Sequence, residues 1–338
     1  STKKMPKQFL NLSGKETLVN EAVDRLLGVA GKEDIFIVTN ENYVGLCQEQ
    51  LPEIPKENII AEPAARNTAP CVGLAAAIIS KKYDDATMMV LPSDHLIKFN
   101  DIFIDALNTA CAVAEQGENL VTIGITPTYP ETGYGYIYFG KTEDSAHSNV
   151  YKVKRFVEKP NLETAKEYLA SGKYLWNSGM FVWKVSTILN NFKELLPDTY
   201  DGLMKIKEAF GTPDFEETLK KEFCAFKSES VDYGIMERAQ NIYTIPGSFG
   251  WDDVGSWLSL ERINTTNEFG NVVSGNVITI DSKNSIITGG EKLIAAVGLE
   301  DVIIVDTDDA ILICSKENTQ DVKRVIENLK ICNKNQYL

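Results

Sequence analysis

Short apolar runs alternate with amphipathic segments in the first part of the chain. Residues 35–38 and 88–91 form runs of strand length, whereas residues 68–82 and 102–115 carry apolar side chains at helical spacing. This alternation predicts βαβ units. The run from Leu120 to Ile125 is apolar along most of its length, which favours a strand covered on both faces. We therefore expect a doubly wound α/β layer here.

The character of the chain changes after Thr126, where Gly, Tyr and Pro become more frequent. An α+β lid on the same sheet is predicted, with strands at residues 135–139 and 150–157 and helices at residues 162–171 and 187–195. Polar helices follow at residues 198–210 and 215–222, and another begins near Val231. No chemical motif is apparent in these last three helices.

Very short β-branched segments separated by turns fill residues 270–314. Strands of this length that recur with turns predict the coils of a β-solenoid or a small sheet. The closing segment, residues 319–331, has apolar residues at helical spacing and predicts an amphipathic helix. Its apolar face needs a partner, in the same chain or in a second subunit. We expect two domains, residues 1–264 and residues 265–338.

Composition and charge exclude several classes of protein. Apolar residues make up 43% and charged residues 24% of the 338 residues, which excludes a disordered chain. No run approaches the ~20 apolar residues of a membrane span and no basic-then-apolar leader is present, so we expect a soluble, cytoplasmic protein with no membrane contact. The net charge of -14, without a basic tract, argues against nucleic acid as a partner. A small anion still fits, because local lysines and a divalent cation reverse the local field.

The cysteines and histidines do not indicate a reactive centre. The six cysteines are scattered without a Cys-x-x-Cys pair, so free thiols are expected rather than disulfides or a zinc site. No Ser/His/Asp or Cys/His triad is apparent. His95 is expected to shape the turn beside Asp94.

Two acidic positions are candidates for a metal site. Asp94 follows the apolar run 88–91, and ligands of open α/β sheets gather beyond the carboxyl ends of the strands. Asp252 and Asp253 follow a glycine-containing turn, and carboxylate oxygens suit Mg²⁺. Asp also begins turns and caps helices, so each position has a structural alternative.

Two further segments carry polar side chains that suit a sugar phosphate. Glu158 and Lys159 end a predicted strand; a carboxylate accepts hydrogen bonds from sugar hydroxyls and an ammonium binds phosphate. The alternative is an exposed, salt-bridged strand end. Residues 176–181 place Asn177 and a serine in a predicted turn between aromatic residues, which suits a polar ligand on an apolar floor, or only a turn before a strand.

The order and setting of these motifs resemble the mannose-1-phosphate guanylyltransferase (GDP-mannose pyrophosphorylase) family. The resemblance extends over nearly the whole chain. It is carried by the segments at residues 6–9, 62–70, 91–95, 132–137, 156–160, 176–181 and 251–257. It implies a nucleotidyltransferase-type, Rossmann-like mixed sheet flanked by helices, a small C-terminal left-handed β-helix, and a homodimer.

The resemblance also implies roles for individual residues. Asp94 and Asp253 would hold Mg²⁺, with Asp253 preferred over Asp252 because it precedes the Val-Gly of the motif. The nucleotide would be bound by Lys7, Glu62, Asn67, Thr68 and Asp94. The mannose and its phosphate would be bound by Gly135, Glu158, Lys159, Asn177 and Gly179. Lys7, Asp94, Lys159 and Asp253 are the expected catalytic residues.

The implied reaction joins GTP and mannose 1-phosphate to give GDP-mannose and pyrophosphate, without a covalent intermediate. Catalysis would rest on positioning and on charge neutralisation by Mg²⁺ and lysine. Two unneutralised charges ~4 Å apart repel by about 4 kcal/mol at an effective dielectric constant of 20, which is roughly three decades in rate.

One part of the family pattern is not seen in this sequence. The resemblance implies that a first strand and a Gly-rich, Arg-containing phosphate loop precede Ser1, so the chain is expected to be truncated, cleaved or incomplete. Loss of that central strand would leave two unpaired sheet edges. The alternatives are a nucleotidyltransferase for another nucleotide or sugar phosphate, and a non-catalytic paralogue that binds sugar nucleotides.

Overall fold

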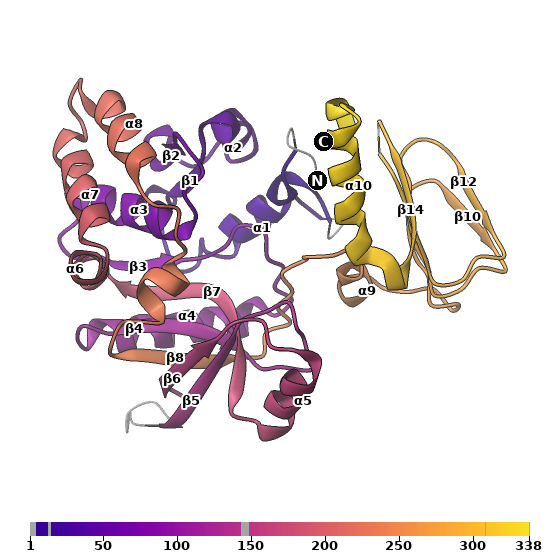
Figure 1. Cartoon of the computed structure of the whole chain (residues 1–338), viewed down its shortest axis with the longest axis horizontal. Coiled ribbons are helices and arrows are strands. Elements are labelled where there is room, and N and C mark those ends of the chain that lie inside the picture. The colour runs from indigo at the N-terminus through magenta and orange to yellow at the C-terminus, as the bar shows by residue number, and fades with distance from the viewer. Residues whose placement is uncertain (1–4, 13–14, 143–148, 308, 338) are drawn as a thin grey trace. The chain divides into compact units, whose positions relative to one another are not determined.

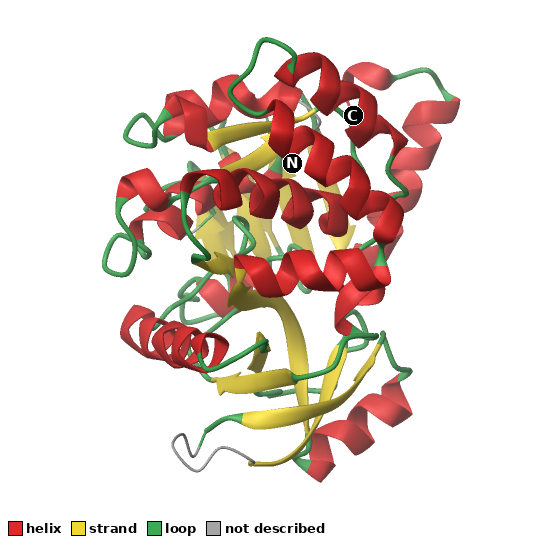
Figure 2. Ribbon diagram, turned by 90° about the vertical axis from the view of Figure 1, so that its left-hand side faces the viewer, coloured by secondary structure: helices red, strands yellow, loops and turns green. Residues whose placement is uncertain are grey.

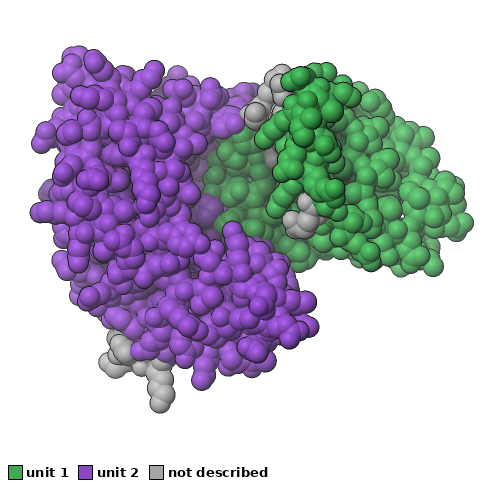
Figure 3. All heavy atoms as spheres, viewed as in Figure 1, with its two compact units in different colours: residues 1–22, 93–96, 252–338 green, residues 23–92, 97–251 purple. Residues whose placement is uncertain are grey.

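The computed structural model describes residues 5–12, 15–142, 149–307 and 309–337 (Figure 1). The chain forms two compact units, coloured separately in Figure 3. Unit 1 comprises Ser1–Ala22, Ser93–Leu96 and Asp252–Leu338, and unit 2 comprises Val23–Pro92 and Ile97–Trp251. The domain boundary between residues 264 and 265 follows the change in sequence pattern and stays a prediction.

A six-stranded mixed sheet forms the centre of unit 2, in the order β3-β7-β4-β8-β6-β5 (Figure 2). Its strands are β3 (Thr87–Val90), β4 (Leu120–Ile125), β5 (Tyr136–Thr142), β6 (Tyr151–Val157), β7 (Tyr174–Lys184) and β8 (Ile242–Gly247). A parallel pair, β1 (Ile37–Asn40) and β2 (Ile59–Glu62), forms a second sheet.

Helices pack on both faces of the six-stranded sheet, as the apolar run at residues 120–125 predicts. Leu120 belongs to a core that includes buried residues of α3 (Thr68–Lys82), α6 (Val185–Leu195), α7 (Pro197–Ala209) and α8 (Phe215–Ala225). Val121 and Ile123 belong to a second core that includes buried residues of α4 (Asn100–Glu115). Successive side chains of a strand point to opposite faces, so β4 contributes to both cores. The predicted doubly wound, mixed α/β fold is therefore confirmed.

Among the described residues, six helices of unit 2 agree closely with the predicted segments, whereas α2 (Val44–Gln50) has no predicted counterpart. The six are α3 (Thr68–Lys82), α4 (Asn100–Glu115), α5 (Leu162–Ser171), α6 (Val185–Leu195), α7 (Pro197–Ala209) and α8 (Phe215–Ala225). The short helix α1 (Leu18–Asp24) leads into this unit. Instead of the third polar helix near Val231, the structure has a single π-helical turn, Asp232–Met236.

The predicted turn at residues 176–181 is wrong. These residues lie inside β7, whose two halves both pair with β4, and the register shifts between the pairs Ile123↔Met180 and Gly124↔Asn177. Ser178 and Gly179 therefore bulge out of the ladder, and Gly179 has the positive φ of +69° that glycine adopts most easily. The polar residues between the aromatic ones form a bulge and not a turn, because the strand continues on both sides of them.

Short parallel strands in unit 1 stack into the predicted β-helix. They are β9 (Val272–Ser274), β10 (Val277–Ile280), β11 (Ile286–Thr288), β12 (Ile294–Val297) and β13 (Val302–Asp306), with β14 (Ile311–Ser315). Val272, Ile286 and Ile303 occupy equivalent positions in neighbouring coils and share one buried core. The last strand, β14, pairs antiparallel to β13 and so ends the series of coils.

Unit 1 also contains α9 (Ser259–Ile263) and the closing amphipathic helix α10 (Val322–Ile331). The apolar residues Val325, Ile326 and Ile331 of α10 are 48%, 44% and 76% exposed. The expected need for a partner on this face therefore persists in the folded chain. Within the described ranges, none of the helices has the length and apolarity needed to span a membrane.

A buried asparagine joins two coils of the β-helix. Asn271 Nδ2 donates to the carbonyl of Ser282 at 2.7 Å, and Asn271 Oδ1 accepts from the N–H of Ser285 at 2.9 Å. Both serines are at most 2% exposed, so water does not readily replace the amide. The side chain therefore satisfies two backbone groups that coiling would leave unpaired.

We expect Asn271→Ala to lower the free energy of unfolding by about 2–3 kcal/mol, because two buried backbone groups lose their partner. Denaturant titration of the purified protein measures this change. Asn276→Ala is the control: its amide makes one exposed bond to the carbonyl of Glu291, so its effect is expected to stay within about 0.5 kcal/mol. Equal effects of the two substitutions would contradict the bridging role of Asn271.

Candidate functional site

An isolated antiparallel bridge brings the two acidic motifs of unit 1 together. Leu96 and Asp252 exchange both backbone hydrogen bonds, with N···O distances of 2.9 Å and 3.0 Å. Asp94 lies two residues before one end of the bridge, and Asp253 directly follows the other. Segments that are far apart in the sequence thus place their carboxylates on adjoining turns.

Lys7 connects these two turns. Its Nζ lies 2.9 Å from Asp94 Oδ2 and also donates a hydrogen bond to the backbone carbonyl of Asp253. The short 3-10 helix Lys7–Phe9, with Phe9 buried, anchors this lysine. We call Lys7, Asp94 and Asp253 the carboxylate group. The sequence-predicted catalytic residues of unit 1 are therefore neighbours in the fold.

The two adjacent acids of the Trp251–Trp257 motif have different surroundings. Asp252 is 6% exposed, accepts from the N–H of Val254, and forms an ion pair with Arg262 at 2.5 Å. Asp253 accepts from the N–H of Gly255 at 3.0 Å, in exposed surroundings. Asp252 is thus buried and paired with a cation, whereas Asp253 is half-buried and more accessible to solvent. Neither caps a helix in the manner of the structural alternative, since α9 begins at Ser259.

His95 packs beneath the carboxylate group. Its Nε2 lies 3.8 Å from Asp94 Oδ1. Burial lowers the pKa of His95 below its ordinary value of 6.5, an effect larger than the opposing pull of Asp94. The imidazole is therefore neutral at pH 7, and Lys7 supplies the positive charge beside Asp94.

The chemistry of the carboxylate group fits a divalent metal. Mg²⁺ is usually bound through one or two carboxylates, with water and substrate phosphates completing its octahedron. Asp94 and Asp253 provide two carboxylates on adjoining turns. The described residues contain no cluster of three or more His, Cys, Asp or Glu side chains suited to a metal, so these two would hold it together with the substrate.

The predicted nucleotide residues of unit 2 lie at the end of β2 and the start of α3. Asn67 caps the helix with a φ of +66°, and its Oδ1 accepts from the N–H of Thr68 at 2.8 Å. Thr68 Oγ1 accepts from the N–H of Val231 at 2.9 Å, which leaves its hydroxyl proton available. Both predicted residues therefore also have structural tasks.

The environment of Glu62, the last residue of β2, disfavours the charged form of its carboxyl group. Burial raises the pKa of its carboxyl above the ordinary 4.5, while a hydrogen bond with the Cys71 thiol opposes this rise. Its Oε1 is buried and finds no hydrogen-bond partner among the residues that the structure describes. A buried, unpartnered carboxylate oxygen destabilises the fold. A group that supplies a donor, such as a nucleobase N–H, would relieve this cost.

The predicted sugar residues of unit 2 surround the bulge in β7. Asn177 donates its backbone N–H to the carbonyl of Gly135 at 2.8 Å, and its side-chain Oδ1 accepts from the N–H of Gly179 at 3.1 Å. A Cβ on Gly135 would lie 2.9 Å from Glu158 Oε1, so a larger residue there would displace the end of the Glu158 side chain. The positive charge of Lys159 lowers the pKa of Glu158, although burial raises it more. These five residues thus form one polar group.

Asp232 contacts one of the predicted sugar residues, and sequence reasoning missed it. Its Oδ1 accepts a hydrogen bond from Asn177 Nδ2 at 2.7 Å. Its segment was expected to be a polar helix without chemistry, because nothing in the sequence placed it near Asn177. The one available signal is a single acid in the otherwise apolar run Val231 to Met236.

We expect Glu62→Gln to stabilise the protein at pH 8 and to lose this advantage as the pH falls to 5. The raised pKa of Glu62 means that folding penalises its ionised form. The penalty is absent where the carboxyl is protonated in both states, and grows as the pH rises through its folded pKa. Thermal melting at both pH values measures the difference. Glu57→Gln, an exposed acid just before β2, is the control, with no expected change. A stabilisation independent of pH would contradict the assignment.

Two family models match the chain: Nucleotidyl transferase over residues 1–268, and the MannoseP isomerase/GMP-like beta-helix domain over residues 275–329. Mannose-1-phosphate guanylyltransferase of Klebsiella pneumoniae is 42% identical over 336 residues, covering 98% of this chain and 71% of that protein. Its namesake from Escherichia coli (strain K12) is 43% identical over 333 residues, covering 96% of this chain and 69% of that protein.

A solved structure shares the fold along nearly its whole length. The crystal structure from Thermus thermophilus described as mannose-1-phosphate geranyltransferase superposes with a TM-score of 0.88 at 29% identity. It covers 98% of this chain and 94% of that chain. Together these similarities confirm the resemblance that the motifs carry. The chain belongs to the nucleotidyl transferase family and, within it, to the mannose-1-phosphate guanylyltransferases.

Proposed function

We propose that the chain transfers GMP from GTP to α-D-mannose 1-phosphate, giving GDP-mannose and pyrophosphate. The observation that carries this proposal is the carboxylate group of Lys7, Asp94 and Asp253. It combines a cation with two carboxylates, which suits a triphosphate and a metal. The relatives from Klebsiella pneumoniae and Escherichia coli are named for this reaction.

The reaction we propose is an in-line displacement. A phosphate oxygen of mannose 1-phosphate attacks the α-phosphorus of GTP, the bond to the β-phosphate oxygen breaks, and pyrophosphate leaves with that electron pair. The displacement needs no protein nucleophile, so the side chains act by binding and by charge. Lys7 contributes a positive charge to the triphosphate, and Lys159 contributes one to the sugar phosphate.

Nucleotidyltransferases of this family generally use a divalent metal, and we propose Mg²⁺ held by Asp94 and Asp253. When bound, the ion supplies Lewis-acid neutralisation of the phosphate oxygens. The chain itself keeps the two carboxylates on adjoining turns through the bridge between Leu96 and Asp252. Lys7 ties the same two turns together and limits the repulsion between the acids.

The base and the sugar are assigned to groups of unit 2. The guanine edge carries two neighbouring donors, N1–H and the 2-amino group, and Glu62 is the carboxylate among the predicted nucleotide residues of unit 2. Asn67 and Thr68 start α3, whose N-terminus favours negative charge. Mannose hydroxyls are assigned to Gly135, Glu158, Asn177 and Gly179, around the bulge in β7.

We also propose that the chain forms a homodimer through α10. Three apolar residues of this helix, Val325, Ile326 and Ile331, are between 44% and 76% exposed. A patch of this kind on a regular amphipathic helix is typical of an interaction surface. The same helix of a second copy offers a matching apolar face under two-fold symmetry.

We expect pyrophosphate release from GTP and mannose 1-phosphate only with Mg²⁺, and less than a tenth of that rate with ATP or UTP. Asp94→Asn and Asp253→Asn should each lower kcat/KM at least about 100-fold, because each removes one of the two carboxylates proposed to bind the ion. Asp281→Asn, an exposed acid in the β-helix, is the control and should stay within two-fold. Pyrophosphate release is measured continuously with a coupled phosphate assay.

Other outcomes of this assay separate the alternatives. Faster turnover with ATP or UTP would establish a nucleotidyltransferase for another base. Folded protein that binds GDP-mannose without releasing pyrophosphate would establish the non-catalytic alternative. Full activity of Asp94→Asn would overturn the metal assignment.

We expect Val325→Glu/Ile326→Glu to convert the dimer into a monomer, because two charges would be buried at the contact. Light scattering coupled to size-exclusion chromatography measures the mass. Asn328→Glu adds charge to an exposed polar position of α10 and should leave the mass unchanged. A wild-type monomer would overturn the dimer proposal.

A further inference from the structure

The side-chain amide of Asn177 has only one possible orientation. Its Nδ2 donates to Asp232 Oδ1 at 2.7 Å, and its Oδ1 accepts from the N–H of Gly179 at 3.1 Å. A carboxylate only accepts and a backbone N–H only donates, so both hydrogen bonds require the same orientation of the amide. One N–H and one lone pair of the amide then remain for a ligand.

The backbone at Asp232 has an uncommon conformation. It begins the π-helical turn Asp232–Met236, and such turns are rare and frequently mark functional sites. The segment before the turn is fixed against the start of α3. Ala69 N–H donates to the carbonyl of Glu229 at 3.0 Å, and Val231 N–H donates to Thr68 Oγ1 at 2.9 Å. The carboxylate is thus placed by the helix that carries the predicted nucleotide residues.

The surroundings of Asp232 disfavour the ionised form of its carboxyl group. Burial raises the pKa of Asp232 above the ordinary 3.8, and the bond from Asn177 only partly opposes this. Its charge also raises the pKa of Glu158. Within the described chain, its hydrogen-bond partner is an amide rather than a cation. Two acids with raised pKa values near one amide indicate a site that receives further hydrogen-bond donors.

We propose that Asp232 is a positioning residue for the sugar phosphate, which it serves by locking the amide of Asn177. The locked amide presents one donor and one acceptor side by side, which matches two neighbouring hydroxyls of a pyranose. This inference rests on the proposed function and adds a residue to its sugar half. Asp232 acts through Asn177 and takes no part in bond making.

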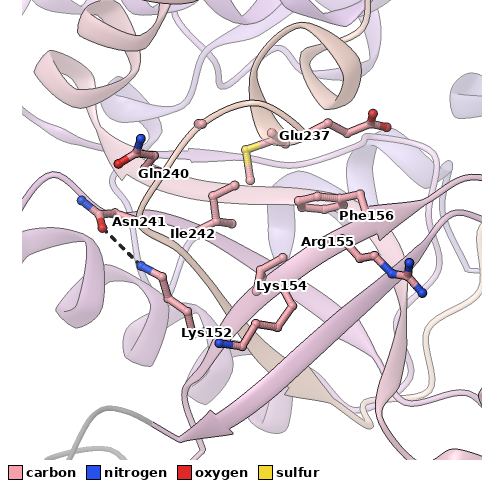
Figure 4. A pocket seen from close by; sticks show the side chains of 11 residues that line it. Lys152, Lys154, Arg155, Phe156, Glu237, Gln240, Asn241 and Ile242 are labelled. Atoms are coloured by element: carbon pink, nitrogen blue, oxygen red, sulfur yellow. Dashed lines mark hydrogen bonds between the residues drawn. The ribbon is translucent and has the colours of Figure 1, made fainter.

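The π-helical turn also offers a matched control. Residues Met236 and Glu237 line a cleft of about 310 Å³ between the end of the turn and β6, and Figure 4 shows the side chain of Glu237 there, near Phe156. Glu237 is an exposed acid whose pKa rises through burial and through the charges of Glu158 and Asp232. Glu237→Ala therefore removes a nearby negative charge without removing the bond to Asn177.

Asp232→Ala should raise the KM for mannose 1-phosphate about ten-fold, the effect of one lost hydrogen bond to a charged group. The KM for GTP should stay within two-fold. Asp232→Asn keeps an acceptor oxygen at the same place and should recover most of the loss. Glu237→Ala should stay within two-fold for both substrates. Initial rates measured over a matrix of both substrate concentrations give the two KM values of each variant.

The swap Asn177→Asp/Asp232→Asn separates positioning from structural support. It reverses the hydrogen bond while keeping its atoms and the total charge, so the melting temperature should match the wild type. The acid at position 177 has no N–H to present, so the KM for mannose 1-phosphate should stay about ten-fold high. A wild-type KM in the swap, or equal rises for both substrates in Asp232→Ala, would overturn the proposal.

The wild-type measurement keeps the two proposals distinguishable. Absence of pyrophosphate release from the wild type would contradict the proposed function. The variants would then be compared by calorimetric measurement of mannose 1-phosphate binding. In that measurement, Asp232→Ala should again weaken binding about ten-fold relative to Glu237→Ala. Equal binding by these two variants would overturn the role of Asp232.

Discussion

The bridge between Leu96 and Asp252 is the interaction on which the carboxylate group depends. Two backbone hydrogen bonds place the turn that carries Asp94 next to the turn that carries Asp253. The ion pair of the buried Asp252 with the partly exposed Arg262 holds the same turn. Because the bridge uses backbone groups and the ion pair uses Asp252, neither interaction occupies the carboxylates of Asp94 and Asp253.

Close approach of like charges is the second constraint on the site. The chain carries a net charge of -14, and the carboxylate group gathers two acids where a polyanion is expected to bind. Lys7 offsets part of this charge by contacting both acidic turns. The proposed binding of phosphates at this place would therefore need cations, from lysines and from the divalent ion that the family generally uses.

A bulge in a long strand creates the polar group of unit 2. Because β7 pairs with β4 on both sides of Ser178 and Gly179, these residues leave the ladder and the polar atoms of Asn177 become available for Gly179 and Asp232. Gly135 admits Glu158 to the same place. The sheet supplies the rigidity and the bulge supplies the polar groups, which suits a site that orients several hydroxyls.

The sequence alone determined most of the local elements and the family, and it supplied the residues proposed for the site. The apolar patterns of the sequence located α3, α5 and β4 with their observed bounds, because the length and spacing of apolar residues follow the local burial of each segment. Motif order pointed to Lys7, Asp94 and Asp253, and the comparisons confirm the family. Only the tertiary structure decided that residues 176–181 form a bulge, since strand pairing on both sides is a non-local property. It alone brought Asp232 to Asn177 and distinguished the buried Asp252 from the half-buried Asp253, because contacts between residues far apart in the chain leave no periodic signal in the sequence.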